Sequence, residues 1–177
     1  LIGVLLVTVT GLGYSRFVEA RERAHAEAAQ ESAERTRRAA EEVLRFMDGL
    51  GRQGPSERRA DDPWTFREAL QSSTPALRAR LHDDPDVGVY LAAAVGRLLS
   101  RQGDAEAGLA LIREAVEVGD RRLGAADIIT CEARKRAMAA YMEEGRLDDL
   151  VREAQLLLAA REPLAGRRDD YVLHARA

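Results

Sequence analysis

The sequence predicts an all-α fold built from repeated helical hairpins, and three observations support this. Residues recur in pairs at a spacing of 42: Val87 and Ile129, Gly103 and Gly145, Gly124 and Gly166, and Asp127 and Asp169. Between these positions, both copies have the apolar spacing of a helix, a short turn and a second helix. Aromatic residues make up only 5% of the chain, so the core must be built from small aliphatic side chains. A fixed period of about 20 to 50 residues is typical of stacked repeats.

The first residues form an uncharged apolar run from Leu1 to Tyr14. A helix that spans a bilayer needs about 20 such residues, so we interpret residues 1–16 as a truncated transmembrane helix. Arg16, Arg21 and Arg23 follow at once, as flanking charges do. Two alternatives stay open at this stage, namely the core of a signal peptide and a buried strand or helix.

Residues 17–50 are predicted to form one long juxtamembrane helix, because no proline interrupts them and the first glycine is Gly49. A seam with weak heptad spacing runs through Ala26, Ala29, Ala33, Thr36, Ala40, Val43, Met47 and Leu50. Its side chains are small up to Val43, whereas a strong coiled coil would carry larger ones. The segment is therefore either a solvated connector helix or a weak parallel dimerisation helix.

Residues 51–64 are rich in Gly, Pro, Ser and charge, which predicts a linker. Trp64, the only tryptophan, is expected to pack where the linker meets the repeats. Residues 65–86 form the predicted capping helix region, which begins with a capping box of Thr65 and Glu68. Pro75 either kinks this helix or lies in the first turn of a second short helix that Thr74 caps.

Two clusters invite a chemical interpretation. The run from His82 to Asp86 holds a histidine and three acids, which could suggest a metal site. The alternative is a helix start, with Asp84 as the N-cap and Pro85 at the first helical position, and we favour it. Cys131 falls on the pattern of buried small residues and is expected to pack in the core. We expect no catalytic residue, no metal and no cofactor within this chain.

The two copies occupy residues 87–127 and 128–169, and Tyr171 begins a third at 170–177, where the sequence breaks off. Their spacing resembles that of tetratricopeptide repeats. The structural positions of the repeat are Val95, Gly96, Leu99, Gly103, Gly108, Ile112 and Ala115 in the first copy, and Tyr141 and Gly145 in the second, degenerate copy. Small residues are expected where the helices cross, and Gly103 is expected to end a helix in the left-handed conformation.

The period of 42 also resembles the extended repeats of the kinesin light chain, whose second helix ends in a phrase like Arg121-Arg122-Leu123-Gly124. Those repeats hold peptides through paired asparagines in the first helix. The matching stretch here is Leu91-Ala92-Ala93-Ala94, so this mode of peptide binding does not carry over.

The order of the parts resembles the region after the kinase domain in bacterial membrane-anchored receptor-type serine/threonine protein kinases. The residues that carry the resemblance are Val43-Leu44-Arg45-Phe46-Met47, Thr65-Phe66-Arg67-Glu68-Ala69-Leu70 and Leu81-His82-Asp83-Asp84-Pro85-Asp86-Val87. The resemblance implies a non-catalytic interaction and sensor region in signal transduction. Membrane-tethered winged-helix transcription regulators carry a similar tail, and a stand-alone scaffold is a third interpretation.

The expected partners are an unidentified protein or peptide, the membrane through residues 1–16, and a second copy in a weak homodimer. Basic residues are scattered and the net charge is −3, so nucleic acid is not an expected partner. The resemblance implies a single-pass protein with its repeats outside the cytoplasm, in the periplasm. The arginines that follow residue 14 favour a cytoplasmic stalk instead, and both placements stay open.

Overall fold

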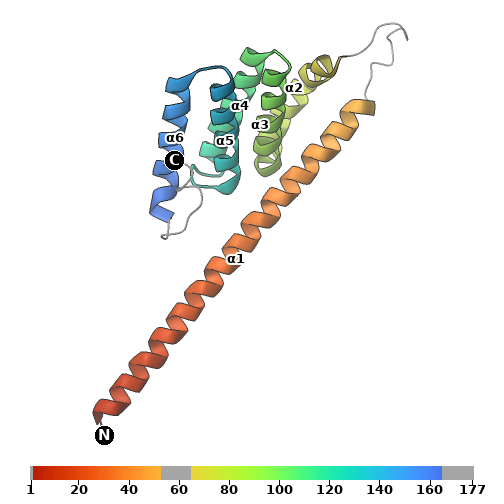
Figure 1. Cartoon of the computed structure of the whole chain (residues 1–177). Helices are drawn as coiled ribbons and strands as arrows, with labels where there is room; N and C mark the ends of the chain where they lie inside the picture. The colour runs from red at the N-terminus through yellow and green to blue at the C-terminus, as the bar shows by residue number, and fades with distance from the viewer. Residues whose placement is uncertain (1, 53–64, 165–177) are drawn as a thin grey trace. The chain divides into compact units, whose positions relative to one another are not determined.

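The computed structural model describes the backbone of residues 2–52 and 65–164, and the side chains of 22–24, 26–50 and 65–163. All regular structure in this part of the chain is helical (Figure 1). The elements are α1 (Ile2–Arg52), α2 (Phe66–Asp83), α3 (Pro85–Arg101), α4 (Ala105–Arg122), α5 (Ile128–Glu143), α6 (Leu147–Arg161) and the 3₁₀ turn η1 (Glu162–Leu164). The prediction of an all-α fold is confirmed.

The chain divides into two compact units, Leu1–Arg35 and Thr36–Ala177. The first unit is the N-terminal part of α1. Within the described residues, no helix is both long and apolar enough to cross a bilayer. The side chains of the predicted transmembrane segment 1–16 lie outside the described residues. The same holds for most of the predicted linker, Trp64 included, and for residues 165–177, which hold Gly166, Asp169 and Tyr171.

In the second unit, helices α3 to α6 pack side by side as two consecutive pairs (Figure 1). Helix α3 packs against α2, α4 and α5, and α5 packs against α4 and α6. The core consists almost wholly of Ala, Val, Leu and Ile, with Tyr141 as its one fully buried aromatic ring among the described residues. Because such small side chains fill the core, the helices approach each other closely.

Three glycines end helices in the left-handed backbone region: Gly103 with φ 85°, Gly124 with φ 102° and Gly145 with φ 69°. A side chain would be strained there, which explains the residue type. The turns at Gly103 and Gly145 make the same capping bond 42 residues apart. The N–H of Asp104 donates to the Leu99 carbonyl at 3.0 Å, and the N–H of Arg146 donates to the Tyr141 carbonyl at 2.8 Å.

Helices α3 and α4 make their closest crossing at Gly96 and Gly108. A Cβ atom at Gly96 would lie 2.7 Å from the Gly108 carbonyl oxygen and 2.7 Å from Cγ1 of Ile112. Both glycines are buried. The side chains packed around this part of the core are also buried: Val95, Leu99, Ile112 and Ala115. The crossing therefore depends on the absence of side chains at two facing positions.

Helix α2 starts with the predicted capping box. The N–H of Glu68 donates to Thr65 Oγ1 at 3.3 Å, and the N–H of Thr65 donates to Glu68 Oε2 at 3.0 Å. The helix then runs without a break through Pro75, so the alternative in which Thr74 caps a second helix is wrong. The Thr74 hydroxyl instead donates to the Leu70 carbonyl one turn earlier, at 3.3 Å.

Asp84 is the single residue between α2 and α3, with Pro85 at the first helical position as predicted. Its side chain makes no capping hydrogen bond, because φ −139° and ψ 82° place it outside the usual cap geometry. Gly88 permits this tight connection, since a Cβ there would lie 2.5 Å from the Arg80 carbonyl oxygen.

The last turns of α1 belong to the second unit and pack on its core. Ala39 is fully buried, Leu50 is buried, and Val43 and Met47 pack against the same cluster. The larger residues of the weak heptad seam thus pack within the chain, whereas the sequence had left open a solvated connector helix or a face for a second copy. The reason is their position on the side of α1 that faces the helical pairs, which periodicity alone does not specify.

Candidate functional site

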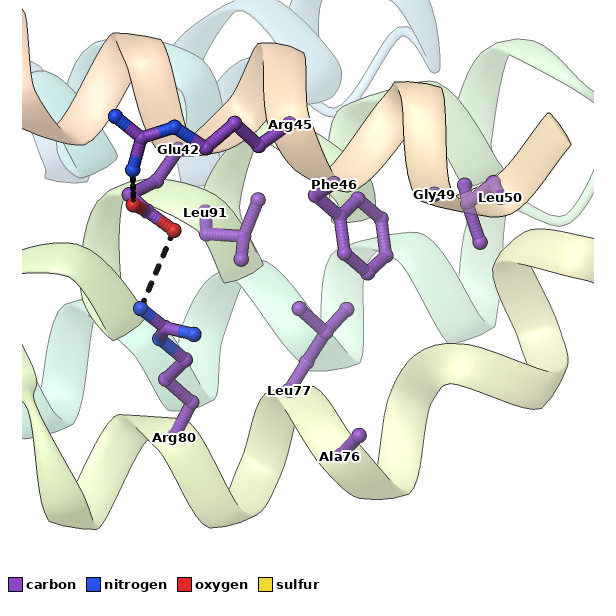
Figure 2. Close-up of a pocket in the computed structure, with 9 residues that line it drawn as sticks. All are labelled: Glu42, Arg45, Phe46, Gly49, Leu50, Ala76, Leu77, Arg80 and Leu91. Carbon is purple, nitrogen blue, oxygen red and sulfur yellow. Dashed lines mark hydrogen bonds and ion pairs between the residues drawn. The ribbon is translucent and has the colours of Figure 1, made fainter. Parts of the chain in front are cut away.

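A solvent-open hollow lies between the C-terminal turns of α1 and the middle of α2, and its volume is about 370 Å³. Figure 2 shows how side chains from both helices point into it, with Leu91 of α3 at its base. We call it the α1–α2 hollow and define it by its lining residues, which are Glu42, Arg45, Phe46, Gly49, Leu50, Ala76, Leu77, Arg80 and Leu91.

The hollow exists because two of its lining residues contribute almost no side chain. A Cβ atom placed on Gly49 would find nothing within 4 Å, and Ala76 offers only a methyl group. Larger apolar side chains surround this gap, and Leu77 and Leu91 among them are buried. Protein interiors are normally close-packed, so an open apolar hollow of this size suits an apolar side chain or a small apolar group from another molecule.

Charged groups form one side of the hollow. The Glu42 carboxylate accepts hydrogen bonds from Arg45 of α1 and from Arg80 of α2 (Figure 2). The Arg80 Nη2 to Glu42 Oε2 distance is 3.3 Å. Two guanidinium groups share this carboxylate, and Arg45 also pairs with Glu41, with 3.9 Å between Arg45 Nη2 and Glu41 Oε2. The hollow thus combines an apolar floor with a charged edge that could hold a polar group of a partner.

A second, smaller groove of about 200 Å³ lies between α4, α5 and α6. Its floor holds Arg134, whose side chain is only 5% exposed. Arg134 donates to both carboxylate oxygens of Asp120, at 2.8 and 2.6 Å, and to Glu153 Oε2 at 2.5 Å. One arginine thereby joins three helices. We assign this ion triad a structural role, because the Arg134 guanidinium is already paired with two carboxylates of the same chain.

Helices α3 and α5 also interact through side chains that are half-buried or exposed. The Arg136 guanidinium lies 4.0 Å from the centre of the Tyr90 ring, and Arg97 Nη2 lies 3.0 Å from Glu143 Oε1. These contacts tie the first helices of the two pairs together.

Cys131 lies in the core of α5 and is fully buried, as predicted. Burial raises the pKa of its thiol to about 11, with smaller contributions from neighbouring charges that partly cancel. The thiolate is the reactive form of cysteine, so this residue is an inert packing group at neutral pH. Burial likewise raises the pKa of Tyr141.

None of the repeat positions identified from the sequence lines the α1–α2 hollow. Val95, Gly96, Leu99, Gly108, Ile112 and Ala115 build the scaffold behind it, and Gly103 and Gly145 form turns. Tyr141 lines the second groove. Sequence reasoning missed Leu77 and Arg80, because they line the hollow together with residues of α1 that are more than 25 positions earlier in the chain, and no local pattern specifies such a contact.

No protein-family model, no curated protein and no solved structure matches this chain. Within the described residues, no group of three or more His, Cys, Asp or Glu side chains is placed to hold a metal ion. Residues 82–86 form the end of α2 and the start of α3.

Proposed function

We propose that this chain is a protein-interaction region of tetratricopeptide-repeat type that binds a peptide or protein partner through the α1–α2 hollow. The observation that supports this most is the hollow itself, an open apolar space beside a charged edge, on a scaffold of packed helical pairs. Ligand sites in proteins are commonly mainly apolar, with a few polar groups that fix orientation. An exposed apolar side chain of a partner would gain free energy by entering this space.

The second part of the proposal concerns the context of the region. The uncharged run from Leu1 to Tyr14, followed by arginines, favours a tether to a membrane through residues 1–16. The resemblance to receptor-type serine/threonine kinases favours a role as the non-catalytic sensor tail of such a kinase, with the repeats outside the cytoplasm. Partner binding at the hollow would then act on α1, which leads towards the tether.

A selection experiment tests the binding proposal. Phage-displayed random peptides are selected on the immobilised chain, and enriched peptides are measured by fluorescence anisotropy. We expect peptides with large apolar residues, and we expect Gly49→Leu to abolish their binding, because the new side chain enters the hollow. Leu44→Ser is the matched control on the same helix, since Leu44 is 70% exposed and does not line the hollow. Enrichment of no peptide, or binding that survives Gly49→Leu, would sink the proposal.

Weak self-association through α1 is a separate part of the proposal. Once Val43, Met47 and Leu50 pack within the chain, the seam has only small side chains left for a second copy, namely Ala26, Ala29, Ala33, Thr36 and Ala40. Small side chains make a weak interface, so we expect a dimer only at high protein concentration. Light scattering over a concentration series is the measurement, and a strict monomer at all concentrations would remove this partner.

A further inference from the structure

Two tyrosines of the second unit lie against arginines that also pair with a carboxylate. The guanidinium carbon of Arg136 is 4.0 Å from the centre of the Tyr90 ring, and its Nη1 is 3.6 Å from Glu132 Oε2. The guanidinium carbon of Arg146 is 5.2 Å from the centre of the Tyr141 ring, and its Nε donates to a carboxylate oxygen of α6 at 2.7 Å. In both places a carboxylate, a guanidinium group and a ring form one cluster.

Such clusters form because a guanidinium group has two kinds of surface. Its N–H groups lie in the plane of the group and point outwards, where a carboxylate accepts them. Its two flat faces carry no donor and are weakly hydrated, so they stack on aromatic rings, whose faces are electron-rich. A carboxylate at the edge therefore does not compete with a ring on the face.

The charged edge of the α1–α2 hollow has the first two parts of this cluster. Glu42 accepts hydrogen bonds from Arg45 and from Arg80 Nη2, the latter at 3.3 Å. The Arg45 and Arg80 side chains are 67% and 45% exposed. Within the described residues, no aromatic ring lies over either guanidinium group. The two arginines of the hollow thus lack the ring that Arg136 and Arg146 have.

The apolar part of the hollow also suits a ring. Figure 2 shows the Phe46 ring pointing into the space from α1, on the side that faces Leu77 of α2. Aromatic rings attract each other in edge-to-face and offset arrangements, and Phe46 offers such a contact. The volume of about 370 Å³ is at the low end of the roughly 300–1,000 Å³ of small-ligand sites. A single side chain is therefore a better match for the hollow than a longer apolar segment.

We infer that the partner inserts an aromatic side chain into the α1–α2 hollow, with its ring against the Arg80 guanidinium group and Phe46. The inference rests on the proposed function, because it names the side chain that the hollow holds. Net charge does not select this occupant, since Glu41 and Glu42 balance the two arginines of the edge. The π-system selects it: a saturated side chain of the same size fills the hollow but leaves the guanidinium faces without a ring.

Two small probes differ in this property. N-acetylphenylalaninamide carries a phenyl ring, and N-acetylcyclohexylalaninamide carries a saturated, more hydrophobic ring of similar size. Their binding to the full chain is measured by NMR, from the arginine Nε–H signals and the backbone signals of residues 46–50 and 76–80. We expect the phenyl probe to bind about two- to fivefold more tightly, which is the effect of a cation–π contact at an exposed site. Hydrophobic burial alone predicts the opposite order.

Two variants assign the preference to Arg80. Arg80→Met keeps the apolar stem and removes the guanidinium group, so it should abolish the preference for the phenyl probe. Arg101→Met is the matched control and should keep the preference, since Arg101 of α3 is exposed and does not line the hollow. Equal or tighter binding of the cyclohexyl probe to the unsubstituted chain would overturn the inference, as would no binding of either probe.

The outcomes separate this inference from the proposed function. If both probes bind equally and Gly49→Leu abolishes the binding of both, the hollow holds apolar groups without selecting a ring, and only this inference fails. If the phage-selected peptides still bind the Gly49→Leu variant, the proposed function fails. A several-fold gain in affinity for the phenyl probe in a Trp64→Ala variant would show that a ring of this chain occupies the hollow, and would overturn the assignment to a partner.

Discussion

Arg80 of α2 donates a hydrogen bond to Glu42 of α1 at 3.3 Å, across one side of the α1–α2 hollow. The pair joins two helices that are separated in the sequence by the predicted linker. Its side chains are 45% and 20% exposed, so water screens it only in part. A ligand in the hollow would lie directly beside this connection, which makes the pair a natural element of partner recognition.

The Glu42–Arg80 pair should contribute modestly to stability. We expect Arg80→Met, which keeps most of the apolar stem, to lower the free energy of unfolding by about 0.2–1 kcal/mol. The loss should shrink in about 1 M NaCl, where exposed charges are screened. Urea unfolding at low and high salt measures both effects. Arg101→Met is the control, since Arg101 is exposed and has no ion pair among the described residues. A large, salt-independent loss would contradict this assignment.

Two glycines in helices should respond to alanine in opposite directions. Gly49→Ala should raise the free energy of unfolding by about 0.5–1 kcal/mol, because a Cβ meets nothing there and alanine favours the helix. Gly96→Ala should lower it by about 1–3 kcal/mol, because its Cβ would collide with the Gly108 carbonyl oxygen 2.7 Å away. Thermal unfolding of both variants measures the two effects, and an unchanged or raised melting temperature of Gly96→Ala would refute the close crossing.

The buried triad centred on Arg134 should be far more sensitive than the surface pair. Arg134→Met leaves Asp120 and Glu153 without their shared cation, and we expect a loss of about 3–5 kcal/mol. Adding Asp120→Asn and Glu153→Gln in the same chain should recover much of that stability, since the uncompensated charges are removed. Chemical denaturation of the single and the triple variant measures this. No recovery in the triple variant would mean that packing, and not charge, determines the loss.

Cys131 should be unreactive until the chain unfolds. Its folded pKa of about 11 lies above the ordinary value of 9.0, so the unfolded thiol ionises first as the pH rises. Stability should therefore decrease as the pH rises above about 9, because the unfolded state then binds fewer protons than the folded state. A thiol reagent at pH 8 should label the protein only in denaturant, and Cys131→Ala should remove this part of the alkaline decrease. Rapid labelling without denaturant would place the thiol at the surface.

Much of the fold could be predicted because the signals were local. The glycines at 103 and 145 mark helix ends through backbone conformation, and Thr65 with Glu68 marks a helix start through hydrogen bonds between near neighbours. Pro75 was harder, because a proline can end a helix or lie within one. Here α2 passes through it while its last turns pack on α3.

The candidate site could not be predicted for a physical reason. The α1–α2 hollow forms where Gly49 and Ala76 leave space between two helices, and residues far apart in the sequence meet around it, which no local pattern specifies. Val43 and Met47 show the same effect, since periodicity identified their face but not its partner. The exposure of Val151 likewise follows from the neighbours that α6 has in space, which its own sequence does not encode.

Hydrogen exchange, recorded with and without the most strongly enriched phage-selected peptide, tests the central claim most directly. Binding at the α1–α2 hollow should slow exchange in the turns around Phe46 and Gly49 of α1 and around Leu77 of α2, and Gly49→Leu should abolish that protection. Protection confined to other helices, with these turns unchanged, would show that the hollow is not the binding site.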